Sequence, residues 1–124
     1  MVTGALIVLA IAVGLGLALS TPYLREDRAR LPGARWLGPL HGILGACGLT
    51  LLLAALTGPP RGVTTGTASF GPAAALVFGL ALVLGIAIWL LVRRNQRAPG
   101  LLVAVHAGVA ITGMTMFLAW AGLE

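Results

Sequence analysis

The chain has 124 residues, of which 59% are hydrophobic and only 9% are charged. A soluble domain of this length carries far more charge, because its surface must be solvated, so the composition excludes an ordinary soluble domain. The net charge of +5 comes from eight arginines and no lysine. In a soluble protein this excess would suggest nucleic acid, but arginines beside membrane spans have a topological explanation, and we expect no nucleic-acid partner.

Four apolar stretches follow one another, at about residues 3–21, 37–57, 72–92 and 100–122. Each is close to the roughly 20 residues that cross the hydrocarbon core of a bilayer. We therefore predict an all-α membrane protein, a four-transmembrane-helix bundle that forms a single transmembrane domain over residues 1–124. The first stretch is not expected to be a cleaved signal peptide, because no positive side chain precedes it and the basic residues follow it.

Seven of the eight arginines lie in two segments that connect spans, residues 25–35 and 93–97. The positive-inside rule places both segments in the cytoplasm, and it sends both termini and the loop 58–71 outside. Three tryptophans fall near span ends, where indoles favour the membrane interface: Trp36, Trp89 and Trp120.

The two halves of the chain are similar to each other. “LPGARWLGPLHGILGACGLTLLLAAL” and “APGLLVAVHAGVAITGMTMFLAW” each contain a Pro-Gly pair, then a histidine, then a glycine seven residues later. The spans before them match more loosely, as “VGLGLAL” against “VLGIAIWLL”. The pattern predicts a tandem repeat of two helical hairpins, related by an axis along the membrane normal.

His41 and His106 are the only histidines in the chain. Each lies roughly 8–10 Å inside the cytoplasmic end of its span, at 1.5 Å per residue, and the two spans run in the same direction. Seven residues return a helix to within about 20° of the same direction, so Gly48 shares the face of His41 and Gly113 that of His106. Gly45 lies on the His41 face as well. A flat macrocycle between helices needs a groove of this kind.

Imidazole is a regular axial ligand of haem iron, and four-helix bundles build cofactor sites from side chains on facing helices. The arrangement resembles that of membrane-embedded b-type cytochromes, in which four-helix bundles hold haem between histidines on two helices. This resemblance implies that His41 and His106 are the axial ligands of a haem b and that Gly45, Gly48 and Gly113 face the haem. Many such cytochromes carry four histidines and two haems, whereas this chain has ligands for one.

The chain also resembles small bacterial membrane proteins of the same four-span plan, which implies a multi-pass protein of the bacterial inner (plasma) membrane but no activity. Haem propionates at this depth would turn toward the cytoplasmic face, where Arg35, Arg93, Arg94 or Arg97 could form charge-assisted hydrogen bonds with them. Topology alone would also place arginines there. We expect a small cytochrome that serves electron transfer or haem handling, with a quinol, a soluble donor or a redox partner subunit.

The main alternative is a non-catalytic structural or accessory membrane subunit whose histidines pack helices or handle protons. Metal without haem is less favoured, because zinc needs about four ligands and no carboxylate lies near the rings. Cys47 lies about 120° around the helix from His41 and does not converge with it. No carboxylate lies within a span, which argues against a cationic-drug antiporter.

No nucleophile–base pair or phosphate loop is visible in the sequence. An electron carrier or accessory subunit is therefore favoured over an enzyme with its own substrate. Small residues on the first and third spans would allow a homodimer.

Overall fold

The computed structural model describes residues 1–24, 34–94 and 98–122. Every regular element in these residues is an α-helix: α1 (Val2–Leu24), α2 (Ala34–Leu56), α3 (Phe70–Arg93) and α4 (Gly100–Gly122). All four helices are long and apolar enough to cross a membrane. The predicted all-α, four-span membrane bundle is thereby confirmed, and the spans begin and end within two residues of the expected limits.

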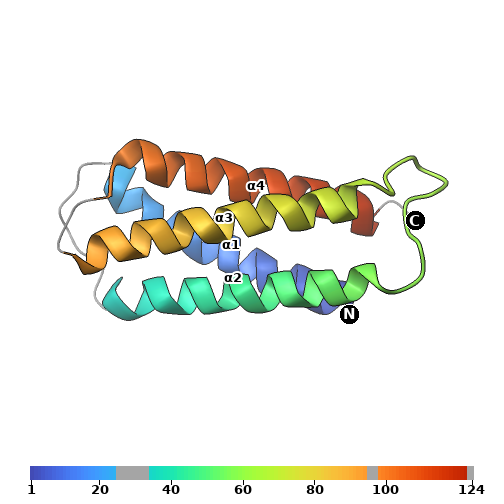
Figure 1. Cartoon of the computed structure of the whole chain (residues 1–124), viewed down its shortest axis with the longest axis horizontal. Coiled ribbons are helices and arrows are strands. Elements are labelled where there is room, and N and C mark those ends of the chain that lie inside the picture. The colour runs from blue at the N-terminus through green and yellow to red at the C-terminus, as the bar shows by residue number, and fades with distance from the viewer. Residues whose placement is uncertain (25–33, 95–97, 123–124) are drawn as a thin grey trace.

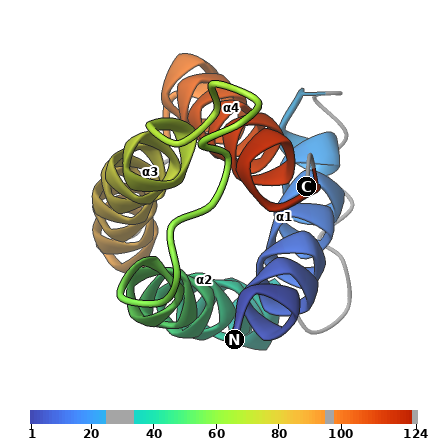
Figure 2. The same ribbon diagram turned by 90° about the vertical axis from the view of Figure 1, so that its right-hand side faces the viewer.

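The helices run up and down in chain order and form a four-helix bundle (Figure 1). In the end-on view, α1 and α3 each lie beside α2 and α4 (Figure 2). The pairs α1–α3 and α2–α4 therefore face each other across the two diagonals of the bundle. This arrangement decides which side chains meet in the interior, because only residues on inward faces reach across a diagonal.

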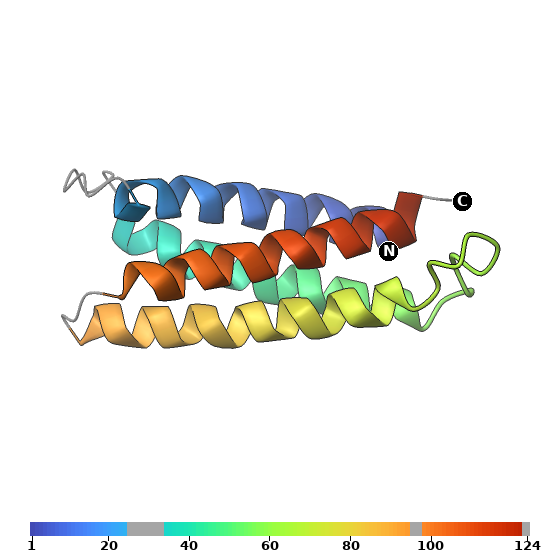
Figure 3. The same cartoon turned by 90° about the horizontal axis from the view of Figure 1, so that it is seen from above.

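The two ends of the bundle differ in what lies there (Figure 3). Helix α1 begins, helix α4 ends, and the loop between α2 and α3 turns at one end, which we call the terminal end. We call the opposite end the arginine end, because α3 ends there with Arg93 and Arg94.

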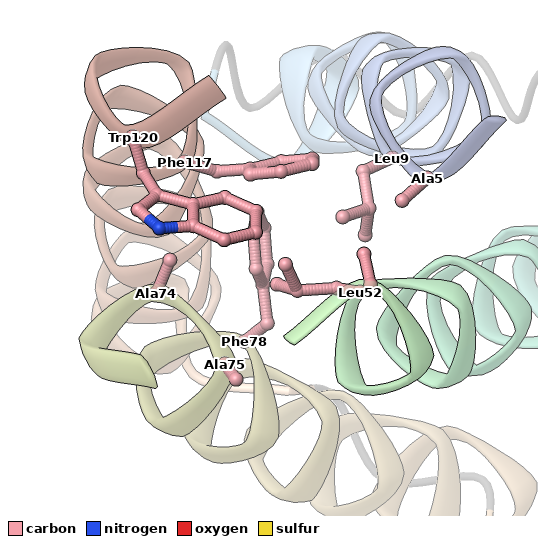
Figure 4. Packing of buried hydrophobic residues seen from close by; sticks show 9 residues of the cluster. Ala5, Leu9, Leu52, Ala74, Ala75, Phe78, Phe117 and Trp120 are labelled. Atoms are coloured by element: carbon pink, nitrogen blue, oxygen red, sulfur yellow. The ribbon is translucent and has the colours of Figure 1, made fainter. Parts of the chain in front are cut away.

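The cluster of large buried apolar side chains lies in the terminal half of the bundle (Figure 4). Phe117 and Leu52 are fully buried, and Leu9 and Trp120 are 2% and 4% exposed. The Phe117 and Trp120 rings lie 6.1 Å apart between centroids. Lipid tails are as apolar as these side chains, so helix association in a bilayer depends on close packing of this kind. With Phe78 of α3, the cluster ties all four helices together at one end.

Trp120 lies two residues before the end of α4, but it is packed differently from the other two tryptophans. Its side chain is 4% exposed, whereas Trp36 is 68% and Trp89 is 41% exposed. Gly71 on α3 makes the burial possible, because a Cβ at that position would lie 2.6 Å from Cε2 of Trp120. A glycine on the neighbouring helix α3 therefore leaves the space that the buried Trp120 indole occupies.

The two-hairpin repeat reappears in the pattern of burial. Three buried positions on α1 have buried counterparts on α3, 69 residues later in the chain: Ala5 and Ala74, Leu9 and Phe78, Ala12 and Ala81. The buried positions on α2 and their counterparts on α4, 65 residues later, are Gly48 and Gly113, Leu52 and Phe117, Ala55 and Trp120. Six buried positions of one hairpin thus recur in the other, whereas the buried residues Ser20, Gly71, Ala75 and Val103 have counterparts that are not buried.

Candidate functional site

His41 on α2 and His106 on α4 meet across the α2–α4 diagonal of the bundle. Their ring centroids are 5.8 Å apart, and the ring planes make an angle of 84°. At 1.5 Å per residue, His41 lies about 10.5 Å and His106 about 9 Å from the first residue of its helix, so the two rings lie at nearly the same level. Both side chains are half-buried. The structure therefore brings together the two histidines that the sequence placed at similar depth.

Each ring is oriented by a hydrogen bond within its own hairpin. Nδ1 of His41 lies 2.9 Å from the carbonyl oxygen of Ala12 on α1, and Nδ1 of His106 lies 2.9 Å from that of Ala81 on α3. A carbonyl oxygen only accepts, so each Nδ1 donates and the proton of a neutral ring is on Nδ1. The described residues form no hydrogen bond to either Nε2. Each neutral ring therefore presents an Nε2 lone pair, the state in which histidine commonly binds a metal.

Gly16 and Gly85 set the space in which the rings lie. A Cβ at Gly16 would come 2.8 Å from Cε1 of His41, and a Cβ at Gly85 would come 3.2 Å from Cε1 of His106. The first distance is shorter than any ordinary carbon–carbon contact, so a methyl group at Gly16 would displace the ring. Both glycines follow, by one helical turn, the alanine whose carbonyl accepts the hydrogen bond.

Several positions next to the two histidines are occupied by glycine or alanine, in contrast to the large side chains of the terminal half. On α2 and α4, the residues four positions after the histidines are Gly45 and Ala110. On α1 and α3, the residues beside the rings are Ala12 and Gly16, and Ala81 and Gly85. The residues of α1 and α3 that contact the two imidazoles therefore have no side chain larger than a methyl group, whereas on α4 the buried Val103 lies one turn before His106.

The three glycines predicted to face a haem lie in different surroundings. A Cβ at Gly48 would come 2.6 Å from Cγ of Leu9, and a Cβ at Gly113 would come 3.2 Å from the ring of Phe78. Close contact between helices is enough to explain the absence of a side chain at these two positions. A Cβ at Gly45 would meet no atom within 4 Å. Gly45 therefore borders open space beside His41.

Two of the four arginines considered as propionate partners have described side chains. The Cζ atom of Arg93 lies over the ring of Trp89, 4.6 Å from its centroid. Arg94 is exposed. Arg97 and the side chain of Arg35 lie outside the described part of the chain, so the expectations for them stay predictions.

Sequence reasoning missed the residues on α1 and α3 that position the rings. Ala12 and Gly16 correspond to Ala81 and Gly85, which lie 69 residues later in the chain, the same spacing as between the buried positions of α1 and α3. Aligning “AVGLG” with “ALVLG” at this step would have revealed the shared Ala and Gly. The carbonyl acceptors carry no side-chain signal, because any residue supplies a backbone oxygen.

Comparison with known proteins finds no family model, no curated protein and no solved structure that matches this chain.

Proposed function

We propose that this protein is a small membrane b-type cytochrome that holds one haem b between His41 and His106. The pair of imidazoles across the bundle, 5.8 Å apart between centroids, is the observation that supports it. Two metal–nitrogen bonds of about 2 Å each, together with about 1 Å from each nitrogen to its ring centre, put two axial imidazoles roughly 6 Å apart. The observed separation is close to this requirement.

The donor set also fits a haem. A haem iron takes its remaining protein ligands from one or two axial side chains, and histidine is a common one. A protein-only zinc site requires about four ligands. Within residues 1–24, 34–94 and 98–122, no three His, Cys, Asp or Glu side chains gather into such a group. The described residues thus offer two nitrogen ligands, which suits an iron that the macrocycle already coordinates.

The small residues around the rings support the same proposal. A flat macrocycle held by residues on one diagonal of the bundle requires small side chains on the other. Helices α1 and α3 meet this requirement with Ala12, Gly16, Ala81 and Gly85, and Gly45 borders open space on α2. Arg35, the second residue of α2, is our proposed partner for a propionate.

When bound, the haem would supply one-electron redox chemistry. The chain's own contribution is to hold and tune that group. Hydrogen bonds from Nδ1 to a carbonyl fix the ring orientation and raise the basicity of Nε2, which strengthens it as a ligand. With one ligand pair near one end of the bundle, the protein would exchange electrons with a quinol, a soluble donor or a partner subunit. We place the arginine end in the cytoplasm and both termini outside it, in the inner membrane of a bacterium.

The visible spectrum of the purified protein, produced with haem available and then reduced with dithionite, tests the proposal. We expect a Soret band with sharp α and β bands, lost in both His41→Ala and His106→Ala. Cys47→Ala is the matched control, because Cys47 is exposed on the same helix as His41, and its spectrum should be unchanged. A colourless protein, or a spectrum that survives both histidine substitutions, would overturn the haem assignment.

A second candidate is the structural or accessory subunit, and one observation favours it. Each histidine joins the two helices of its own hairpin, α1 to α2 and α3 to α4, through a hydrogen bond. Such bonds are worth well under about 1 kcal/mol on average within a membrane. This candidate predicts a colourless protein that co-purifies with a partner and whose histidine variants assemble less well with it.

A further inference from the structure

A groove opens between α2 and α3 at the arginine end of the bundle. Its volume is about 360 Å³, and it is lined by Trp36, Pro39, Trp89 and Arg93. Trp36 is the first residue of the α2 span, and Arg93 is the last residue of the α3 span. The groove therefore lies where the hydrocarbon core gives way to lipid headgroups.

We propose that this groove binds one anionic phospholipid, with the phosphate at Arg93 and the upper part of an acyl chain against the two indoles. Guanidinium groups bind phosphate through paired, charge-assisted hydrogen bonds. Indoles suit the same depth, because they combine a large apolar surface with one N–H group. The lining thus combines a cation for the headgroup with apolar surface for the chain.

The electrostatic state of Arg93 favours an anion. Its guanidinium lies over Trp89, and among the residues that the structure describes it forms no ion pair. A cation–π contact leaves the N–H groups of the guanidinium with hydrogen-bonding capacity, because the ring offers no lone pairs in their plane. A lipid phosphate would satisfy these donors and neutralise the charge.

The groove breaks the symmetry of the two hairpins. The bundle has two gaps between hairpins, α2–α3 and α1–α4. The positions in the α1–α4 gap that correspond by the repeat to the four groove residues are Ser20, Leu24, Leu101 and Ala104. None of them is aromatic or charged. Within the part of the chain that the structure describes, the combination of a cation with two indoles therefore occurs in the α2–α3 gap and not at the corresponding positions of the α1–α4 gap, as expected for a site with one occupant.

Native mass spectrometry of the full chain tests the proposal, with equimolar phosphatidylglycerol and phosphatidylcholine of identical acyl chains added to the detergent. We expect one retained phosphatidylglycerol per chain, with a several-fold preference over phosphatidylcholine. Arg93→Gln should abolish the preference. Arg94→Gln is the matched control, because it removes the same charge from the next, exposed residue without touching the groove. Excess inorganic phosphate should not displace the lipid, because it lacks the apolar contact.

Three results would overturn the proposal. The first is equal retention of the two lipids by the unaltered chain. The second is an equal loss of preference in both arginine variants, which would indicate general attraction by a basic surface. The third is expulsion of the lipid when haem is loaded, which would assign Arg93 to a propionate. Because the experiment is also run without haem, a failure of the cytochrome proposal leaves this test intact.

Discussion

His41 and His106 meet across a diagonal of the bundle, from helices α2 and α4 whose backbones are not in contact with each other. Each ring is held instead from the side, by a carbonyl on the neighbouring helix of its own hairpin. Orientation and pairing therefore come from different parts of the structure. Hairpin contacts fix where each imidazole points, and the docking of one hairpin against the other sets the distance between them.

Asparagine in place of histidine separates the two roles that we consider. In His41→Asn or His106→Asn, the amide nitrogen takes the place of Nδ1 and can still donate to Ala12 or Ala81, but no ligand atom remains at the position of Nε2. We expect haem to be lost from both variants while the midpoint of thermal unfolding in detergent, measured without haem, changes by an amount equivalent to less than about 1 kcal/mol.

The same pair of measurements can contradict the haem assignment. If the Asn variants retain a six-coordinate spectrum, the histidines are not the ligands. A large loss of stability without haem would instead show that the imidazoles mainly support the fold.

Alanine at Gly16 should disturb the His41 ring more than alanine at Gly85 disturbs the His106 ring. The added Cβ would lie 2.8 Å from the imidazole in the first case and 3.2 Å in the second. We expect Gly16→Ala to shift or broaden the low-spin haem signals in electron paramagnetic resonance, and Gly85→Ala to have a smaller effect. Both should weaken haem binding through ring displacement.

The matched control is Gly14→Ala, two residues from Gly16 on the same helix, where a Cβ would meet no atom within 4 Å. An alanine gains up to about 1 kcal/mol of helix propensity over glycine, so this variant should be at least as stable as the original chain. Equal spectral changes in Gly14→Ala and Gly16→Ala would show that the ring contact has no influence.

Gly45 and Gly48 share the His41 face but should respond differently to alanine. At Gly48 the Cβ would lie 2.6 Å from Leu9, so Gly48→Ala should cost about 1–3 kcal/mol by overpacking, with or without haem. At Gly45 the Cβ meets nothing within 4 Å, so Gly45→Ala should leave the haem-free protein stable. If Gly45 faces the haem, its variant should bind haem more weakly, as measured by titration with hemin. Unchanged hemin affinity would remove Gly45 from the proposed site.

Membrane orientation can be tested by cysteine labelling in intact cells, after Cys47→Ser removes the native thiol. Thr65→Cys in the α2–α3 loop should react with a membrane-impermeant maleimide from outside, because the positive-inside rule sends that loop outward. Asn95→Cys, between Arg94 and Arg97 in the sequence, should react only after the membrane is permeabilised. The reverse pattern would place the haem ligands near the outer face and invert the proposed orientation.

The sequence alone determined the number of helices, their approximate limits and the common level of the two histidines. These properties depend on the length of each apolar run and on a rise of 1.5 Å per residue, and both can be read along the chain. The repeat of histidine and glycine further indicated that two hairpins contribute equivalent residues.

The tertiary structure decided which faces of the helices point inward. In a bilayer the interior and the lipid-facing surface are both apolar, so hydrophobic patterning carries little information about rotation. This is why the sequence did not predict that the Trp120 side chain is buried between helices, and why Gly16 and Gly85 were not recognised as neighbours of the histidines. The choice of Nδ1 as donor likewise depends on a backbone carbonyl of a neighbouring helix, which only the packing of the hairpin brings within 2.9 Å.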